Sequence, residues 1–565
     1  MAILAAVVFG AFFTLANCDG NVIVETTRGT VTGFKVDYGN DTSQLYYGQA
    51  DVFLGIRYVQ PPVGALRFAK PVPLTKFKEQ PYDATQFGDA CPQKGNARGY
   101  NMSEDCLVLN IYTPDALSVY KYSVMVFIHG GSLKDGLLGD FPTPGIVRNL
   151  VSRGVVVVAL QYRIGLLGYF TTHSDEFPPN LGLMDQTEAL KWIQQEIANF
   201  GGDPYRITLM GQSAGSSSVA ALLLSPVSQN LFQQAIMESG SILTCFEGAM
   251  GFTKLSQNRA IQLCNFGEDQ WDARNFTALK EDCLQDMDWH NFLEYEDSNI
   301  RGWMLVQDDY MLPATPRDLA KNRPNIPVIY GNCKDEWSGV DLALLAGGYN
   351  ISTYNREYFE FIFAVYANYL GENEETVIGI LESVYMPPGL ADDDHVGWLK
   401  TMSDIFTSAG FTGFTAKEVE WYLENGNDQV YTYEFVFPTD IHRVYNVPGW
   451  KPVFHGAELD MVLMQDYFWE PLLKNGTLSP DDVAVANFMG RTWTNFAKYS
   501  TPLMDGSWTP TKTAQNFEYL EINVQQTMKT GFRTADKLVW NKVLPQIIGI
   551  WPPNVPDYNN GTVSL

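Results

Sequence analysis

Short apolar runs alternate with amphipathic stretches along most of the chain. Residues 123–128, 151–164 and 326–332 contain runs that are apolar at nearly every position. Runs of this length, rich in β-branched residues, are typical of strands buried on both faces of a sheet. Residues 185–200 show helical periodicity instead and end at a Gly-Gly pair, which is a helix stop signal. This alternation predicts an α/β fold with a mostly parallel central sheet and helices on both faces.

The remaining segments follow the same two patterns. Helical patterns fill residues 354–423 and 480–499, and residues 245–323 are helical and irregular. Residues 51–71, rich in proline, glycine and aromatic side chains, are predicted to be irregular. Further strands are predicted at 22–36 (a hairpin), 104–114, 206–210, 232–237, 429–437 and 517–522.

The 565 residues contain no linker, repeat or low-complexity segment that would divide the chain. Residues 1–18 form an apolar run too short to span a bilayer, which is typical of a signal peptide cleaved after Ala16 or Cys18. Residues 551–565 are polar and carry no anchor or retention signal. We therefore expect a secreted, extracellular protein with one α/β domain over residues 19–565 and no membrane anchor.

The charge balance restricts the partners. The net charge is −26, from 38 basic and 64 acidic side chains. Nucleic acids and anionic membranes attract basic surfaces, so this balance argues against both as partners. A small-molecule partner is expected instead, and the sequence leaves the oligomeric state open.

Cysteines and glycan acceptors agree with an oxidising compartment. Of seven cysteines, six remain if Cys18 leaves with the signal peptide, and an even number suits disulfide formation. Proximity along the chain favours two disulfides, with other pairings still open: Cys91–Cys106 and Cys264–Cys283. Cys245 and Cys333 are then either free and buried or joined to each other. Asn-x-Ser/Thr acceptor sites support glycosylation at Asn40, Asn101, Asn275, Asn350, Asn475 and Asn560.

One serine lies at a turn suited to nucleophilic chemistry. The sequence Gly-Gln-Ser-Ala-Gly at residues 211–215 follows an apolar strand pattern and precedes a helical one over residues 214–224. Glycines two residues either side allow a sharp strand–turn–helix bend, which raises the Ser213 hydroxyl above the sheet. A serine hydroxyl also needs a base, an acid that orients the base, and donors for the oxyanion.

The base must be one of six histidines. His455 is favoured because it follows a strand-like segment late in the chain, and such hydrolases order their triads as nucleophile, acid, base. His442, in a proline-bounded loop, is interpreted as surface or packing, and His129 as shaping the glycine turn beside it. The acid then lies between serine and base, where Glu336 and its neighbour Asp335 both follow a predicted strand.

The oxyanion donors are backbone amides. One is that of Ala214, directly after the candidate nucleophile, and the others belong to the Gly-Gly-Ser turn at residues 130–132. Each donor of this kind lowers a reaction barrier by roughly 3–4 kcal/mol.

Several spaced motifs together resemble the type-B carboxylesterase/lipase family, which includes carboxylesterases, cholinesterases, juvenile hormone esterases and non-catalytic neuroligins. The matches cover nearly the whole mature chain: Glu104-Asp105-Cys106-Leu107, Gln161-Tyr162-Arg163, Gly165-Leu166-Leu167-Gly168, Asn180-Leu181-Gly182, Asp185-Gln186, Phe200-Gly201-Gly202-Asp203-Pro204, Gly211-Gln212-Ser213-Ala214-Gly215, Lys334-Asp335-Glu336 and His455-Gly456-Ala457-Glu458. The resemblance implies an α/β-hydrolase fold. It implies Ser213 as nucleophile, Glu336 rather than Asp335 as acid, His455 as base, and Ser239 as a serine that buttresses the acid. It also implies Gly131, Ser132 and Ala214 as the oxyanion donors.

The departures from the family pattern narrow the activity. Ser132 replaces the usual third glycine, Leu133 a usual aromatic, and Arg57 a common proline. Cholinesterases carry a glutamate at the position of Gln212. Juvenile hormone esterases carry a glutamine there, as this chain does. The segment between Cys91 and Cys106 has no tryptophan, so the aromatic surface needed for quaternary ammonium recognition is absent from it. These features favour a carboxylesterase over a cholinesterase.

The sequence therefore predicts a secreted serine carboxylesterase that needs no cofactor or metal. Its activity is expected to fall as His455 protonates near the ordinary pKa of about 6.5. The alternatives are a non-catalytic, neuroligin-like adhesion protein of the same fold and a lipase acting on aggregated lipid. Trp303 and Trp337 are candidates for the acyl or alcohol pocket.

Overall fold

The apolar runs assemble into one mixed sheet in a computed structural model. The model describes residues 20–94, 97–246, 255–296, 303–370 and 373–548. The sheet has 13 strands, in the order β1-β2-β3-β5-β7-β6-β8-β9-β10-β11-β12-β13, with β4 beside β2. The expected signal peptide and Asn560 lie outside the described residues.

The centre of the sheet is parallel and its margins are antiparallel. The parallel strands, in spatial order, are β7 (Val155–Leu160), β6 (Tyr122–Ile128), β8 (Gly202–Gln212), β9 (Gln234–Glu238), β10 (Val328–Cys333), β11 (Val430–Phe435) and β12 (Tyr519–Ile522). Antiparallel pairing joins β1 (Asn21–Thr26), β2 (Gly29–Asp37), β3 (Gln49–Arg57) and β5 (Val108–Thr113) to β7, and β13 (Thr527–Lys529) to β12. The short β4 (Tyr82–Asp83) runs parallel to β2. The predicted α/β fold with a mostly parallel sheet is confirmed.

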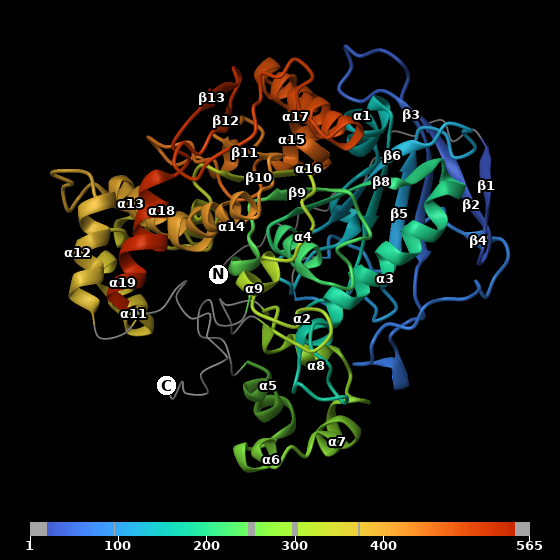
Figure 1. Cartoon of the computed structure of the whole chain (residues 1–565), viewed down its shortest axis with the longest axis horizontal. Helices are drawn as coiled ribbons and strands as arrows, with labels where there is room; N and C mark the ends of the chain where they lie inside the picture. The colour runs from blue at the N-terminus through green and yellow to red at the C-terminus, as the bar shows by residue number, and fades with distance from the viewer. Residues whose placement is uncertain (1–19, 95–96, 247–254, 297–302, 371–372, 549–565) are drawn as a thin grey trace, which may run out of the picture.

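Helices cover both faces of the sheet, and β6 shows why (Figure 1). Its residues Val124 and Val126 belong to the core shared with α3 (Leu181–Glu196) and α4 (Ala214–Leu224). The alternate residues Met125 and Phe127 belong to a second core, shared with α1 (Thr143–Asn149), α15 (Leu459–Leu463) and α17 (Pro480–Tyr499). Successive side chains of a strand point to opposite faces of the sheet. A strand buried on both faces must therefore be apolar along its whole length.

Two helical regions extend from this layered body. A third core lies among the helices α10 (Ser338–Ala346), α11 (Arg356–Leu370), α12 (Glu374–Tyr385), α13 (His395–Thr407) and α19 (Leu544–Ile548). Helices α11, α12, α13 and α19 are on the left of Figure 1, where α18 (Thr534–Leu538) also lies. At the bottom lie the short helices α5 (Leu255–Cys264), α6 (Glu268–Asp272) and α7 (Phe276–Leu279). The remaining helices are α2 (Gly165–Tyr169), α8 (His290–Leu293), α9 (Pro316–Ala320), α14 (Gly413–Glu424) and α16 (Asp466–Lys474).

The prediction of an irregular segment at residues 51–71 is wrong in its first part. Residues up to Arg57 belong to β3, which pairs with β2 on one side and β5 on the other. The register shifts between Phe53 and Ile56, where Gly55 takes a positive φ of 68°. This irregularity and the glycine obscure a strand whose central residues are all buried. The closing strand is also followed by β13, which the sequence did not indicate.

Both favoured disulfides are present. Cys91 pairs with Cys106, and Cys264 with Cys283. Of the two alternatives for the other cysteines, the first holds, since Cys245 and Cys333 are free and buried. The five described glycan acceptors are all exposed: Asn40, Asn101, Asn275, Asn350 and Asn475.

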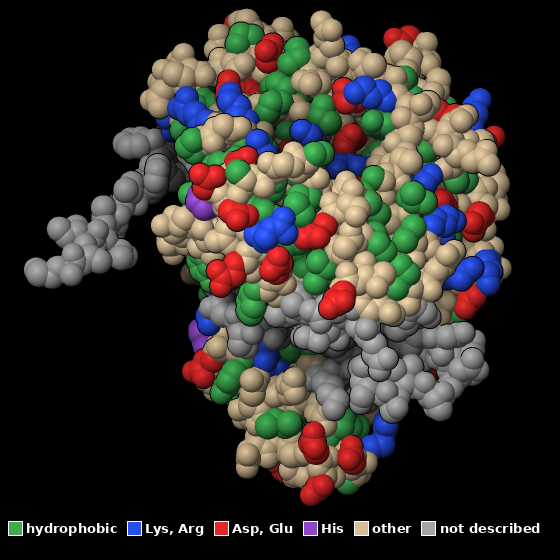
Figure 2. All heavy atoms as spheres, turned by 90° about the vertical axis from the view of Figure 1, so that its left-hand side faces the viewer, with side chains coloured by type: hydrophobic (Ala, Val, Ile, Leu, Met, Phe, Trp, Pro, Cys, Tyr) green, Lys and Arg blue, Asp and Glu red, His purple; other side chains and the backbone are tan. Residues whose placement is uncertain are grey.

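The described helices include none long and apolar enough to cross a bilayer. On the face shown in Figure 2, acidic and basic side chains are interspersed. The net charge of −26 is therefore not gathered into one patch on that face.

Candidate active site

Ser213 occupies a sharp turn between β8 and α4. Its backbone angles are φ 58° and ψ −127°, a region that side-chain-bearing residues rarely adopt. The turn is held by the Ser213 amide, which donates to the backbone oxygen of Glu238 at 2.8 Å. A Cβ on Gly215 would overlap the backbone oxygen of Ile128, so the tight bend requires glycine there. The predicted strand–turn–helix geometry is present around this serine.

His455, between β11 and α15, and Glu336, just after β10, form a close pair. Nδ1 of His455 lies 2.6 Å from Oε2 of Glu336. The other carboxylate oxygen of Glu336 accepts from the Cys333 amide at 2.8 Å and from Nδ2 of Asn332 at 3.1 Å. The Glu336 side chain is fully buried, whereas that of His455 is one-quarter exposed. This arrangement fixes the imidazole with Nε2 towards Gln212.

Asp335 serves a different purpose from its neighbour. Its carboxylate accepts from the Val453 amide at 2.9 Å, and its own amide donates to the Val453 oxygen at 3.0 Å. These bonds anchor the segment that leads to His455 without contacting the imidazole. Of the two candidate acids, the structure therefore brings Glu336 to the histidine.

The environment of His455 favours its charged form. Burial alone lowers the pKa of His455, but the charge of Glu336 and its hydrogen bond outweigh burial, and the charge of Glu458 adds to them. The pKa of His455 is consequently raised above 6.5. The sequence-based expectation of protonation near the ordinary value is corrected upwards.

Ser213 lies beside this pair without a hydrogen bond to it. Nε2 of His455 lies 3.4 Å from the side-chain nitrogen of Gln212, the residue directly before Ser213. Catalytic hydrogen bonds are often long or unformed before substrate binds. The structure thus brings the predicted acid and base into contact and places the predicted nucleophile next to them.

The glycine turn packs directly against Ser213. A Cβ on Gly130 would lie 2.8 Å from Cβ of Ser213, so the two segments touch at this point. Gly131, Ser132 and Leu133 all have positive φ, at 108°, 53° and 59°. In the described structure the amides of Gly131 and Ser132 donate to no protein acceptor. The amide of Ala214, at the first position of α4, lacks an intrahelical acceptor.

His129 and His442 are packing residues. Nδ1 of His129 lies 2.8 Å from the Gly130 oxygen, its ring stacks on Tyr162, and burial lowers its pKa to about 4. It therefore stays neutral and shapes the glycine turn, in agreement with its interpretation. His442 is buried, with Nε2 2.7 Å from Oδ2 of Asp460. The packing alternative for His442 is correct and the surface alternative is wrong.

Ser239 does not contact the acid as expected. Its hydroxyl donates to Oε1 of Glu458 at 2.5 Å, and the Cys333 thiol donates to Oε2 of Glu458 at 2.7 Å. Glu336 contacts His455, Asn332 and the Cys333 amide instead. Burial and the nearby charge of Glu336 raise the pKa of Glu458. Glu458 is a residue of this region to which sequence reasoning assigned no role, although it closes the His-Gly-Ala-Glu motif.

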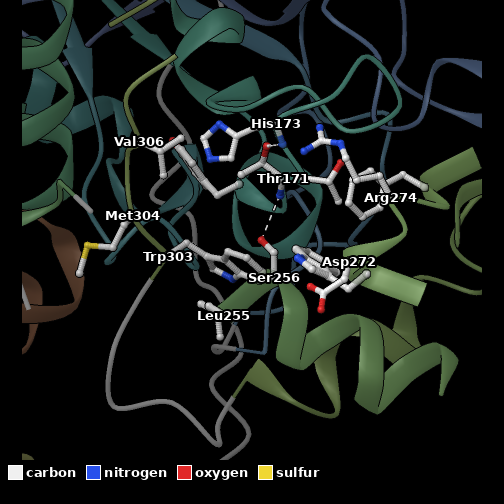
Figure 3. Close-up of a pocket in the computed structure, with 13 residues that line it drawn as sticks. Thr171, His173, Leu255, Ser256, Asp272, Arg274, Trp303, Met304 and Val306 are labelled. Carbon is white, nitrogen blue, oxygen red and sulfur yellow. Dashed lines mark hydrogen bonds between the residues drawn. The ribbon is translucent and has the colours of Figure 1, made fainter. Parts of the chain in front are cut away.

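A cavity of about 410 Å³ lies between the chain after α2 and the helices α6 and α7 (Figure 3). Its lining includes Trp303, His173 and Arg274, but none of Ser213, Glu336 and His455. The indole nitrogen of Trp303 donates to both carboxylate oxygens of Glu296 at 3.1 Å. Trp337 packs against Phe406 with ring centroids 4.9 Å apart. A substrate-pocket role for either tryptophan stays a prediction.

The sheet order, the serine turn after β8 and the carboxylate–histidine pair after the following strands together define an α/β-hydrolase fold. Comparison with known families makes the assignment specific: residues 20–540 match the Carboxylesterase family, and the chain belongs to that family.

Named relatives are similar along nearly their whole length. Rat carboxylesterase 1C is 29% identical over 92% of this chain and 93% of its own. Human carboxylesterase 3 is 29% identical, with coverage of 94% and 92%. The mouse protein named acylcarnitine hydrolase is 28% identical, with coverage of 96% and 95%.

Proposed function

We propose that this protein is a secreted serine carboxylesterase that hydrolyses small-molecule carboxylic esters through an acyl-enzyme on Ser213. The observation that carries this proposal is the 2.6 Å contact of Glu336 with His455 beside a serine in a strained strand–helix turn. Membership of the Carboxylesterase family and the names of the relatives support ester hydrolysis as the reaction class.

In the first half of the reaction, Nε2 of His455 takes the proton of Ser213 as the hydroxyl oxygen attacks the ester carbonyl. Glu336 holds the imidazole in the tautomer with the proton on Nδ1 and stabilises the imidazolium that forms. The amides of Gly131, Ser132 and Ala214 receive the developing oxyanion. His455 then gives its proton to the leaving alcohol, which departs and leaves the acyl group on Ser213.

In the second half, His455 acts as base again. It takes a proton from water, which attacks the acyl carbonyl, and the same three amides stabilise the second tetrahedral intermediate. The imidazolium returns the proton to Ser213 as the carboxylic acid leaves. Each half thus uses one proton transfer through Nε2 in each direction.

Secretion is part of the proposal. Two disulfides, the apolar segment at residues 1–18 and the exposed acceptor asparagines support an oxidising, extracellular location and a glycoprotein. Two sequence features argue against a cationic choline ester as substrate. Residue 212 is a neutral glutamine, and the segment between Cys91 and Cys106 contains no tryptophan.

A non-catalytic adhesion protein is the contrasting candidate. It would have no use for an acid–base pair in contact beside a serine elbow, so the retained geometry favours the enzyme. A lipase would share this geometry, and acceleration of hydrolysis by micelles separates it from a carboxylesterase.

The proposal is tested by hydrolysis of a short-chain nitrophenyl ester by the purified protein and its Ser213→Ala variant. We expect the variant to lose about 10⁵–10⁶-fold in kcat, as removal of a triad serine typically does. Its thermal midpoint should stay close to that of the wild type, because only one hydroxyl is removed. Equal turnover by the two proteins would remove Ser213 from the reaction and favour the adhesion protein.

A further inference from the structure

Gln212 occupies the space between the three parts of the proposed site. It is the last residue of β8 and is buried. Its side-chain oxygen would lie 3.2 Å from a Cβ on Gly130, and its side-chain nitrogen 3.6 Å from a Cβ on Gly456. The amide therefore lies between a glycine of the oxyanion turn and the glycine after the base, with its nitrogen 3.4 Å from Nε2 of His455.

The direction of this contact follows from the other side of the imidazole. Glu336 can only accept, so Nδ1 of His455 carries the proton in the neutral ring. Nε2 then presents a lone pair, and only the NH₂ group of Gln212 can donate to it. The same lone pair must accept the Ser213 proton in the first catalytic step. Gln212 and Ser213 consequently compete for one atom.

The charges around His455 are distributed unequally. The carboxyl group of Glu336, after β10, contacts Nδ1, and its charge and that of Glu458, before α15, both favour the protonated imidazole. The ring of Phe411 packs on the imidazole at 4.9 Å. The contact at Nε2 is with Gln212, which is uncharged. A carboxylate of the same shape at this position would bring a negative charge to the one side of the base that has none among these contacts.

We propose that Gln212 is a positioning residue that occupies Nε2 of His455 in the resting enzyme and yields it to Ser213 when substrate binds. The inference rests on the proposed function of Ser213 and His455. It makes the resting serine less activated than the enzyme–substrate complex, and it assigns to the neutral amide a role that glutamate cannot perform.

Two variants of equal length separate the parts of this role. In Gln212→Glu the carboxylate cannot donate to the Nε2 lone pair. It accepts a hydrogen bond from a protonated Nε2 instead, which favours the imidazolium. An opposite charge at this distance shifts a pKa by about 1–3 units, so the acid limb of kcat/KM should move up by about 1–3 pH units. Gln212→Met frees Nε2 without adding charge, and labelling of Ser213 by a small organophosphate should become about fivefold faster.

The profile of kcat/KM reports the free enzyme and that of kcat the substrate complex. Because the contact belongs to the resting enzyme, the limb of kcat/KM should move more than that of kcat. Gln270→Glu, at an exposed helix start, is the matched control for one added negative charge and should leave both limbs unchanged.

A purely structural Gln212 would lower the thermal midpoint in its variants and leave the acid limb and the labelling rate unchanged, which would overturn the inference. If Gln212→Glu does not fold, the labelling rate of Gln212→Met decides alone. Wild-type protein that neither hydrolyses esters nor reacts with the organophosphate would instead overturn the proposed function.

Discussion

The two sides of His455 are built differently. On the Nδ1 side, Glu336 is fully buried and both of its oxygens are hydrogen-bonded, and the Glu458 carboxyl behind it accepts from Ser239 and Cys333. On the Nε2 side, Ser213 is unbonded to the base, and two backbone amides of the glycine turn have no acceptor within the described structure. The hydrogen bonds that hold the base are complete before substrate binds. On the side that meets the substrate, Gln212 contacts Nε2 and the amides of the glycine turn stay free.

The largest loss of activity is expected when the contact of Glu336 with Nδ1 of His455 is altered. Glu336→Gln keeps the size of the side chain but donates towards Nδ1 and favours the wrong imidazole tautomer. We expect a loss of about 10⁴-fold in kcat, as found when a triad carboxylate becomes an amide. Steady-state hydrolysis of the nitrophenyl ester measures it.

Asp335→Asn is the matched control, since the amide oxygen can still accept from Val453. It should keep kcat within a few-fold of the wild type. If it fell as far as Glu336→Gln, the assignment of the acid would be wrong.

The next largest effect is expected from Gly131→Ala, which alters the glycine turn proposed to bind the oxyanion. A Cβ at Gly131 would overlap the backbone oxygen of Asp135, and its φ of 108° disfavours any side chain. The turn must shift, and with it the amide donors, so kcat should fall by about 10²–10³-fold, the usual cost of one oxyanion donor. Unchanged KM with reduced kcat would locate the loss in the transition state, while unchanged kcat would exclude this turn from the oxyanion site.

The pH dependence compares the two protonation states of the base. Only neutral His455 can take the Ser213 proton, and the pKa of His455 is raised above 6.5. Activity should therefore rise with pH through a limb above 6.5, with about a tenfold loss per pH unit below it. The raised pKa of His455 affects folding stability in the opposite direction. Its contribution to the free energy of unfolding is complete below the pKa of the unfolded state and is lost as pH rises through the pKa of the folded state. A limb at or below 6.5 in kcat/KM would contradict the charge pairing with Glu336.

The smallest effect is expected from the layer behind the acid. Ser239→Ala removes one of the two donors to the buried Glu458 carboxyl. Leaving a buried acceptor under-satisfied costs about 1–3 kcal/mol, so the free energy of unfolding should fall by that amount, with kcat changed only a few-fold. Chemical denaturation measures the first quantity. A loss of activity as large as that of Glu336→Gln would mean that Ser239 acts on the acid after all.

The sequence predicted the candidate site residues better than the contacts around them. Ser213 and His455 could be proposed because strand ends and chain order restrict where a triad can lie, but the same reasoning left Glu336 and Asp335 both open, and only the family resemblance favoured Glu336. The contacts of Ser239 with Glu458, and of Gln212 with His455, join segments more than 200 residues apart and depend on packing that no local pattern encodes. In the fold, the buried central strands were evident from their apolar runs. Strand β3 was missed because Gly55 and a register shift interrupt its pattern.

The most direct measurement is covalent labelling of the intact protein with an organophosphate, followed by mass spectrometry of its peptides. The account predicts one label per chain, located on Ser213, with ester hydrolysis lost in proportion to labelling. Labelling at another residue, or full labelling of Ser213 with hydrolysis undiminished, would contradict the claim that this serine is the nucleophile.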